Sequence, residues 1–407
     1  MIITSKILIT MHRGDKPIRN GAVVIDRGVI RDVGTVNNIM KRHPYHRVCA
    51  LENSVIMPGL VNLHTHLELP PLFDIIRAKN FTDWVLNLIR INKELRSKNY
   101  TAAASDNIKK LIETGTTTVG EICTHDVSPG LLKKSGLRAI VFREIISMNP
   151  SSRSPLLSHI FPLTSSLIKT GLSPHAPHTV SESVLRQIRT YARKHNLPLS
   201  MHVAESRDEL RLLQRRKGGL ERLYNAAGWD LSWAPVADSP VEYLKGLGLL
   251  NPGFLAVHAV QVTDNDIKIL KKTSTPVAHC PRSNRELGVG KMPLRKLMDV
   301  GITVGLGTDS LASSPSLNMW DEMRYAYMIH RQDGISAEDI FKLATISGAK
   351  ALGLDKEIGA LETGKRADII ALRLPSKNTG DLYSDLLRET NSCIMSTVNG
   401  TLLFQVK

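Results

Sequence analysis

The feature that most constrains the fold of this chain is an alternation of short apolar runs with amphipathic helical stretches, from about residue 55 to residue 354. Strands that alternate with helices predict βα units and a parallel sheet. Eight apolar runs occur over about 300 residues, which predicts an α/β fold, a distorted (β/α)8 TIM barrel with insertions. The runs are Val61–Leu63, Thr116–Ile122, Leu137–Ile146, Lys169–Ser173, Pro198–Met201, Phe254–Val257, Pro276–Ala278 and Ile302–Leu306. Helical periodicity between them covers Phe81–Arg96, Thr101–Glu113, Ser181–His195, Pro240–Leu247, Asp264–Lys272 and Asn318–Gln332.

The two ends of the chain have a different pattern, made of short strands and turns. Near the N-terminus, Asp26-Arg-Gly28 is typical of a hairpin turn between two strands. Near the C-terminus, strand-like runs cover Ala367–Leu374 and Thr397–Phe404. We therefore expect residues 1–56 and 358–407 to form one composite β-sandwich domain, and residues 57–357 to form the catalytic barrel.

Titratable side chains follow most of the eight predicted strands. In a barrel, groups at the carboxyl ends of the strands meet at one face, where active sites lie. His64 and His66 end the first run and project to the same side of a strand, because residues i and i+2 share a face. Two convergent imidazoles suit zinc or iron. The other groups at strand ends are Glu121, Arg143, Glu144, His175, His202, His258, His279 and Asp309. The alternative, that each of these is an ordinary structural residue, needs a separate explanation at every strand.

Composition excludes several classes of protein. The sequence is 42% hydrophobic and 22% charged, as in soluble globular proteins. Its 4 cysteines show no Cys-x-x-Cys spacing, so neither a disulfide framework nor a cysteine zinc site is indicated. The first apolar run is too short for a signal peptide, and no run reaches membrane-spanning length. We expect a cytoplasmic protein that does not enter membranes.

The net charge is strongly positive, since 53 lysines and arginines exceed 38 aspartates and glutamates by 15. Such an excess is compatible with an anionic partner. Here the basic residues are scattered in pairs and triplets, without a basic tail or an aromatic platform. A solvated basic surface is favoured, and no nucleic-acid partner is expected. The sequence does not explain the excess itself, and a homo-oligomer is left open.

Several stretches together resemble the amidohydrolase superfamily along nearly the whole chain. They are Met57–His66, His202-Val-Ala-Glu205, Val257-His258, Ala278–Asn284, Gly305–Ser310 and Ile358–Ala371. The resemblance implies the barrel with its terminal β-sandwich and one divalent metal ion, with zinc expected and iron or manganese as alternatives. It implies the ligands His64, His66, His202 and Asp309. Binuclear members carry a lysine on the fourth strand. The corresponding run here, Thr170–His178, ends in histidines, although Lys169 lies just upstream.

The same resemblance implies catalytic roles in the deaminase branch of the superfamily. The metal would lower the pKa of its water. His258 would orient that water, Asp309 would take its proton, and Glu205 would protonate a ring nitrogen of the substrate. Zinc deaminases with a Pro-Cys-x-x-Cys motif are not matched, because no Cys-x-x-Cys occurs.

At finer detail the chain resembles deaminases of adenine-type nucleosides. His175 would contact the ribose or base, and Arg143 would bind a substrate carboxylate. Aminodeoxyfutalosine in menaquinone biosynthesis is the leading substrate, followed by S-adenosylhomocysteine and methylthioadenosine. The alternatives are an aminohydrolase or chlorohydrolase acting on guanine, cytosine or triazine rings, and a barrel scaffold without catalysis. The roles of Glu121, His279 and Arg282 stay undecided.

Overall fold

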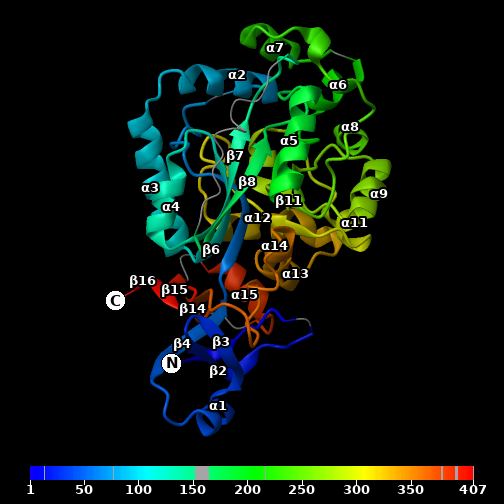
Figure 1. The fold of residues 1–407 in the computed structure, drawn as a ribbon. Coiled ribbons are helices and arrows are strands. Elements are labelled where there is room, and N and C mark those ends of the chain that lie inside the picture. The colour runs from blue at the N-terminus through cyan, green and yellow to red at the C-terminus, as the bar shows by residue number, and fades with distance from the viewer. Residues whose placement is uncertain are drawn as a thin grey trace.

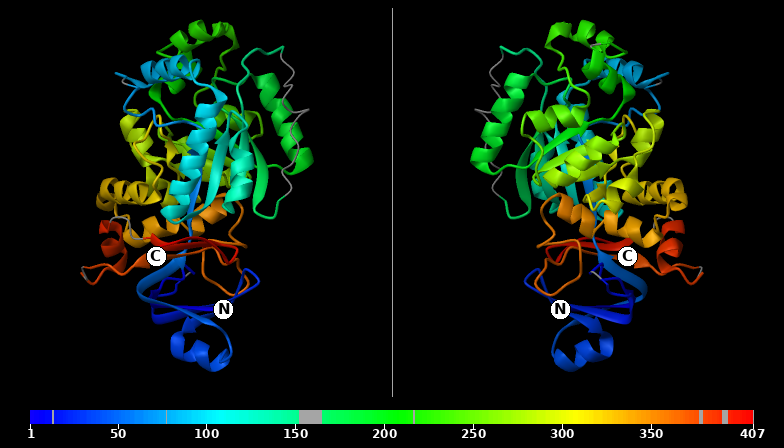
Figure 2. Two further views of the ribbon diagram at one scale, coloured as in Figure 1. Left: turned by 90° about the vertical axis from the view of Figure 1, so that its left-hand side faces the viewer. Right: turned by 90° about the vertical axis from the view of Figure 1, so that its right-hand side faces the viewer.

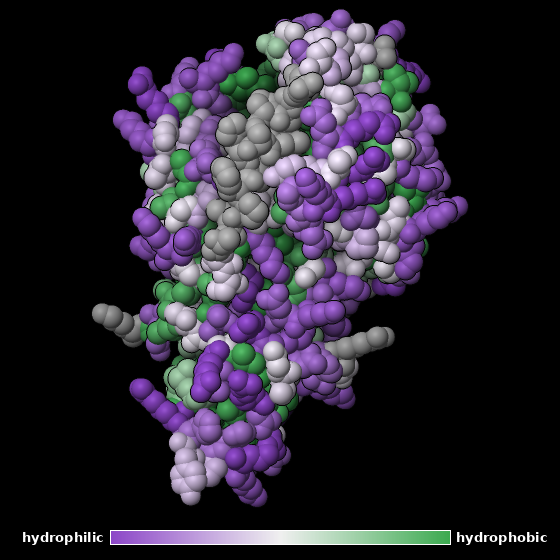
Figure 3. All heavy atoms as spheres, viewed as in Figure 1, coloured by the Kyte–Doolittle hydropathy of each residue, from purple (hydrophilic) through white to green (hydrophobic). Residues whose placement is uncertain are grey.

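The computed structural model describes residues 1–407 except 13, 77, 152–164, 216, 377–378, 390–392 and 407. It has two parts, an upper α/β part and a smaller sheet beneath it (Figure 1). Both ends of the chain lie in the lower part, as the side views also show (Figure 2). The face seen in Figure 3 is largely hydrophilic, with apolar side chains also visible between the two parts.

The upper part is a curled parallel sheet surrounded by helices, which confirms the predicted barrel class. Its strand order is β12-β11-β10-β9-β8-β7-β6-β5-β13. The last member, β13, follows β12 by two residues and pairs with β5, which brings the first and last strands together. The strands are β5 (Leu60–His66), β6 (Thr116–Cys123), β7 (Arg138–Ile145), β8 (Ile168–Pro174), β9 (Leu199–Val203), β10 (Phe254–His258), β11 (Val277–His279), β12 (Val304–Leu306) and β13 (Asp309–Ser310).

Burial explains why these strands are continuous apolar runs. Every residue of β6, β9 and β10 is buried, because helices cover one face of the sheet and the barrel interior fills the other. The pairing between β8 and β9 is short, with Leu172 opposite Leu199. All eight predicted apolar runs coincide with strands, so the expected βα alternation is confirmed.

The predicted helices also form, with ends shifted by a few residues. Side-chain caps fix several starts: Asn80 accepts from the Asp83 N–H, and Thr263 forms a capping box with Asp266. None of the described helices combines the length and apolarity needed to cross a bilayer. The α-helices of the barrel are α2 (Phe81–Asn92), α3 (Ser97–Glu113), α4 (Ser128–Ser135), α5 (Glu182–His195), α6 (Arg207–Arg215), α7 (Glu221–Ala227), α8 (Pro240–Gly246), α9 (Asp264–Thr273), α10 (Pro281–Glu286), α11 (Leu294–Asp299), α12 (Met319–His330), α13 (Ala337–Leu343) and α14 (Ile346–Ala351).

The lower part is a seven-stranded mixed sheet built from both ends of the chain, in the order β16-β15-β14-β4-β1-β2-β3. The predicted hairpin turn at residues 26–28 joins β2 to β3. The run Thr397–Phe404 is not one strand: Asn399 and Gly400 both have positive φ and turn the chain between β15 and β16. Its elements are β1 (Ile2–Leu8), β2 (Ile18–Asp26), β3 (Val29–Thr35), α1 (Val36–Arg42), β4 (Val48–Pro58), β14 (Ile369–Arg373), α15 (Leu382–Arg388), β15 (Cys393–Val398) and β16 (Thr401–Gln405).

A buried ion pair joins the barrel to this sheet. The guanidinium of Arg138, at the start of β7, donates to both carboxylate oxygens of Asp368 at 2.8 and 3.0 Å. Only 5% of the Arg138 side chain and 2% of the Asp368 side chain are exposed. Asp368 also accepts from the backbone N–H of Asn399 at 2.8 Å. The pair therefore ties three chain segments together away from water.

Replacing Arg138 by Met is expected to lower the free energy of unfolding by about 3–5 kcal/mol, because it leaves the Asp368 charge buried and unpaired. Urea unfolding followed by circular dichroism measures the change. Lys169→Met is the matched control, since it removes a pair with Glu357 in which the lysine is 53% exposed, and such pairs contribute about 0–1 kcal/mol. Equal losses in the two variants would contradict a special role for the buried pair.

Candidate functional site

Three histidines and one aspartate meet at the carboxyl end of the barrel. β5 carries His64 and His66, β9 carries His202, and β13 begins with Asp309. One ligand-capable atom from each of the four lies within 4.8 Å of the others, and all four side chains are buried or nearly so. These are the four residues predicted as metal ligands, drawn together from strands far apart in the sequence.

Two of the four donors are held by further hydrogen bonds that leave one atom of each facing the cluster. The Asp309 carboxylate accepts from Ser283 Oγ at 2.6 Å and from Ser313 Oγ at 2.9 Å, both through Oδ2. Its Oδ1 lies 3.5 to 3.6 Å from the Nε2 atoms of His66 and His64. His202 Nδ1 lies 2.9 Å from the backbone carbonyl of His175, so it donates there and leaves Nε2 for the cluster. Such partners orient metal ligands.

The electrostatics of the cluster fit a divalent cation. Both ring nitrogens of His64 are buried without a hydrogen-bond partner. Burial lowers the pKa of His64 and of His66, which favours the neutral imidazoles that bind metals. Burial alone would raise the pKa of Asp309, but the neighbouring His64 and His66 hold it well below its usual value. Three neutral imidazoles and one carboxylate are a donor set that zinc, iron and manganese accept.

A second pair of titratable groups lies beside the cluster. His258 ends β10 with a φ of 74°, and its Nδ1 is 2.9 Å from Asn284 Oδ1, to which it donates. Its Nε2 is left without a hydrogen-bond partner, 3.5 Å from Glu205 Oε1. The backbone N–H of Glu205 donates to Glu209 at 2.8 Å, which fixes the turn after β9. An acid and an imidazole therefore face each other next to four metal-capable donors.

Burial raises the pKa of Glu205 to about 7. The carboxyl group is therefore protonated below about pH 7, where it can act as a general acid. If Glu205 is the general acid of a reaction at this site, kcat/KM should fall as the pH rises through about 7, with a slope of −1 on a logarithmic plot, because the acid form is lost. A profile from pH 5 to 9, with metal content checked at each pH, tests this. A flat profile up to pH 9 would contradict Glu205 as the acid.

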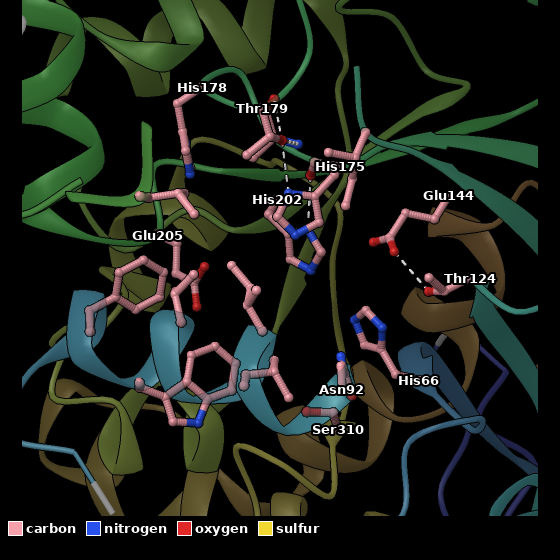
Figure 4. Close-up of a pocket in the computed structure, with 18 of the residues that line it drawn as sticks. His66, Asn92, Thr124, Glu144, His175, His178, Thr179, His202, Glu205 and Ser310 are labelled. Carbon is pink, nitrogen blue, oxygen red and sulfur yellow. Dashed lines mark hydrogen bonds between the residues drawn. The ribbon is translucent and has the colours of Figure 1, made fainter. Parts of the chain in front are cut away.

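One end of a cavity of about 380 Å³ is lined by His66, His202, Glu205, His258 and Asp309. Its far wall is apolar, and no lysine or arginine lines the part that the structure describes. Figure 4 shows His66, His175, His202 and Glu205 around the cavity, with Glu144 and Thr124 on the side away from Glu205. The apolar wall consists of Leu69, Phe81, Trp84, Val85, Leu88, Ile89, Ile146, Leu223, Ala227 and Trp229. The cavity can hold a flat polar ring beside the cluster and an apolar group beyond it.

Comparison with known proteins identifies the family. A sequence model of a protein family, described as "Amidohydrolase family", matches residues 55–401, which is most of the chain. The chain belongs to the amidohydrolase family. The resemblance seen in the sequence is thereby confirmed.

Individual amidohydrolases narrow the activity. A 5-methylthioadenosine/S-adenosylhomocysteine deaminase of Thermodesulfovibrio yellowstonii is 29% identical over 99% of this chain and 92% of its own length. The protein of the same name from Pyrococcus furiosus is 30% identical over 86% and 82%. The crystal structure of Helicobacter pylori aminofutalosine deaminase with methylthio-coformycin has a TM-score of 0.88 and 25% identity, covering 98% of this chain and 99% of that one. This amidohydrolase is a hydrolytic deaminase, and the scaffold alternative is set aside.

The remaining predicted site residues of this amidohydrolase are distributed between the cavity and its surroundings. His175 lines the cavity, and its Nδ1 lies 2.9 Å from Thr179 Oγ1. Arg143 does not line it: its guanidinium pairs with Asp126 at 2.6 Å. Binding of a substrate carboxylate by Arg143 stays a prediction without support from this geometry. Lys169 lies on the exposed side of β8, paired with Glu357, which removes the one candidate for a bridging lysine.

The residues whose roles the sequence left undecided pack around the site. Glu121 is fully buried and accepts from the backbone N–H of Leu67 at 3.0 Å. His279 Nε2 lies 3.1 Å from His330 Nε2. Arg282 donates to Ser316 Oγ at 2.9 Å. None of the three lines the described cavity.

Sequence reasoning missed two groups of residues. Ser283, Asn284 and Ser313 orient Asp309 and His258, and the first two lie inside a stretch that carried the resemblance. The second group lines the cavity: Thr124, His125 and His178. Glu144, which was predicted to lie at the end of a strand, lines the cavity as well.

Proposed function

We propose that this amidohydrolase removes the 6-amino group of an adenine-type nucleoside by hydrolysis, giving the hypoxanthine form and ammonia. One observation carries the proposal: Glu205 and His258 face each other at 3.5 Å beside four convergent metal-capable donors. Hydrolytic attack at a ring carbon requires two groups. One is an acid that protonates a ring nitrogen, and the other is a basic imidazole that accepts a hydrogen bond from the attacking water. The names of the relatives support the same reaction class.

The proposed metal ligands are His64, His66, His202 and Asp309, with zinc as the proposed ion. When bound, a divalent ion supplies Lewis acidity and lowers the pKa of a nearby water. In our proposal, Asp309 and Glu205 carry out the proton transfers and His258 orients the water.

His258 Nε2 accepts a hydrogen bond from the attacking water, and Asp309 receives its proton. Glu205 protonates N1 of the ring, which makes C6 more electrophilic. The water oxygen bonds to C6 and the C6–N6 bond breaks. In the net reaction one water proton stays on N1 and the other leaves with ammonia, so both carboxyl groups return to their starting state.

For the 5′ substituent of the nucleoside, the proposal comes from the resemblance. Aminodeoxyfutalosine in menaquinone biosynthesis leads, followed by S-adenosylhomocysteine and methylthioadenosine. The apolar wall formed by residues such as Phe81, Trp84 and Trp229 supports a substrate with an apolar group beyond the sugar. His175, which lines the same cavity, is proposed to contact the base or ribose.

An ultraviolet assay of the adenine-to-hypoxanthine change tests the proposal. Purified protein supplemented with zinc, iron(II) or manganese is incubated with aminodeoxyfutalosine, S-adenosylhomocysteine, methylthioadenosine and adenosine. We expect turnover of at least one nucleoside, and the largest kcat/KM identifies the 5′ group. Metal-loaded protein that deaminates none of the four would refute the adenine assignment, and ammonia release from guanine, cytosine or a triazine would then identify the alternative ring.

A further inference from the structure

Glu144 is a carboxyl group in the cavity with half of its hydrogen-bonding capacity unused. It lies near the end of β7, where Oε2 accepts from Thr124 Oγ1 at 2.7 Å. Its Oε1 is buried and has no hydrogen-bond partner. A buried carboxyl oxygen without a donor costs free energy. Native structures leave few such atoms, and those that remain call for an explanation.

Among the described residues, no lysine or arginine pairs with this carboxyl group. The adjacent Arg143 pairs with Asp126 instead, since neighbouring residues of a strand point to opposite faces. No lysine or arginine is among the described residues that line the cavity. The missing partner of Glu144 Oε1 is therefore a donor that arrives with a ligand.

We propose that Glu144, held by Thr124, accepts a hydrogen bond from a ribose hydroxyl of the substrate and so selects ribonucleosides over deoxynucleosides. This inference rests on the proposed function and extends it to the sugar. The hydrogen-bond donors that all four candidate nucleosides share are the 6-amino group and the 2′ and 3′ hydroxyls, while N1, N3 and N7 only accept. The 6-amino group is taken up by the reacting end of the cavity. The 2′ and 3′ hydroxyls are the shared donors left for Glu144.

The arrangement of the cavity agrees with this assignment. In Figure 4, Glu144 and Thr124 lie beyond His202 as seen from Glu205, next to His66. A purine with N1 at Glu205 and C6 at the metal-capable cluster directs N9, and hence the sugar, away from Glu205. Thr124 fixes the orientation of the Glu144 carboxyl group before a ligand binds, which reduces the entropy lost on binding.

The test compares the preferred nucleoside of the assay above with its 2′-deoxy and 3′-deoxy forms. A hydrogen bond to a charged group contributes about 1.5–3 kcal/mol, so the wild type is expected to prefer the ribonucleoside by about 10- to 150-fold in kcat/KM over at least one deoxy form. Glu144→Ala should lose activity on the ribonucleoside and bring that ratio close to 1. Glu144→Gln keeps an accepting oxygen and should give an intermediate ratio.

Glu182→Gln is the matched control, because this carboxylate lies on the surface of α5 and is paired with Arg186. It should leave the ratio unchanged. A merely structural role for Glu144 would lower the kcat/KM of all three nucleosides by the same factor, and that outcome would overturn the inference, as would a wild-type ratio below 3. Absence of any nucleoside turnover by the wild type would instead refute the proposed function, so the two failures are distinct.

Discussion

Glu205→Gln is expected to lower kcat by about 10²- to 10⁴-fold, the usual contribution of a positioned general acid. The change keeps the size of the side chain and leaves the backbone N–H bond from residue 205 to Glu209 in place. An amide cannot give its proton to the ring nitrogen. KM should change little, because the lost interaction acts mainly in the transition state. Steady-state kinetics on the preferred nucleoside measure both constants.

Two controls test whether lost metal or a nonspecific effect of removing a carboxylate explains the result. The metal content of the variant, measured by atomic absorption, should equal that of the wild type, since Glu205 is not among the four proposed ligands. Glu338→Gln, which alters an exposed pair with Lys342 on α13, should keep full activity. A Glu205→Gln enzyme with kcat within threefold of the wild type would show that the acid is another group.

Asp309→Asn is expected to remove most bound metal and to lower kcat by at least about 10³-fold, since Lewis-acid catalysis contributes several kcal/mol and each 1.36 kcal/mol is a factor of ten. The carboxylate is the one charged donor of the cluster. Its Oδ2 accepts from Ser283 and Ser313, and an amide nitrogen at that position cannot accept. Metal analysis and kinetics on the same preparation measure the two effects.

A milder variant should show a partial loss of the same two properties, metal content and kcat. Ser283→Ala removes one of the two hydrogen bonds that orient Asp309, and the loss of such a partner typically costs 10- to 100-fold in metal affinity or activity. The variant should therefore retain measurable turnover that excess zinc partly restores. Full metal occupancy in Asp309→Asn would contradict its assignment as a ligand.

The strands of the barrel and the residues that follow them could be predicted from local pattern. Apolar runs of strand length and helical periodicity between them are properties of neighbouring residues, so they can be recognised without knowledge of the fold. The prediction that His64, His66, His202 and Asp309 would meet needed one further step, the rule that parallel barrel strands end at one face. Their convergence within 4.8 Å agrees with that rule.

Arg143 and Glu144 illustrate what the pattern could not decide. Adjacent strand residues point to opposite faces, so an error of one residue in the register exchanges the inside for the outside. From the sequence, Arg143 was predicted to bind a substrate carboxylate. In the structure Glu144 lines the cavity and Arg143 pairs with Asp126. The prediction of a single strand over Thr397–Phe404 was also wrong, because Asn399 and Gly400 turn the chain inside this apolar stretch.

The sequence by itself determined the class of fold and the family, and through the resemblance it suggested the proposed reacting groups, since these are expressed in contiguous motifs and their spacing. Only the tertiary structure decided which side chains orient those groups and which line the cavity. Ser283 and Ser313 reach Asp309 from separate elements, and Glu144 has its free oxygen in the cavity because β7 is packed in one register. Such contacts depend on how distant segments pack, and no local pattern records that packing.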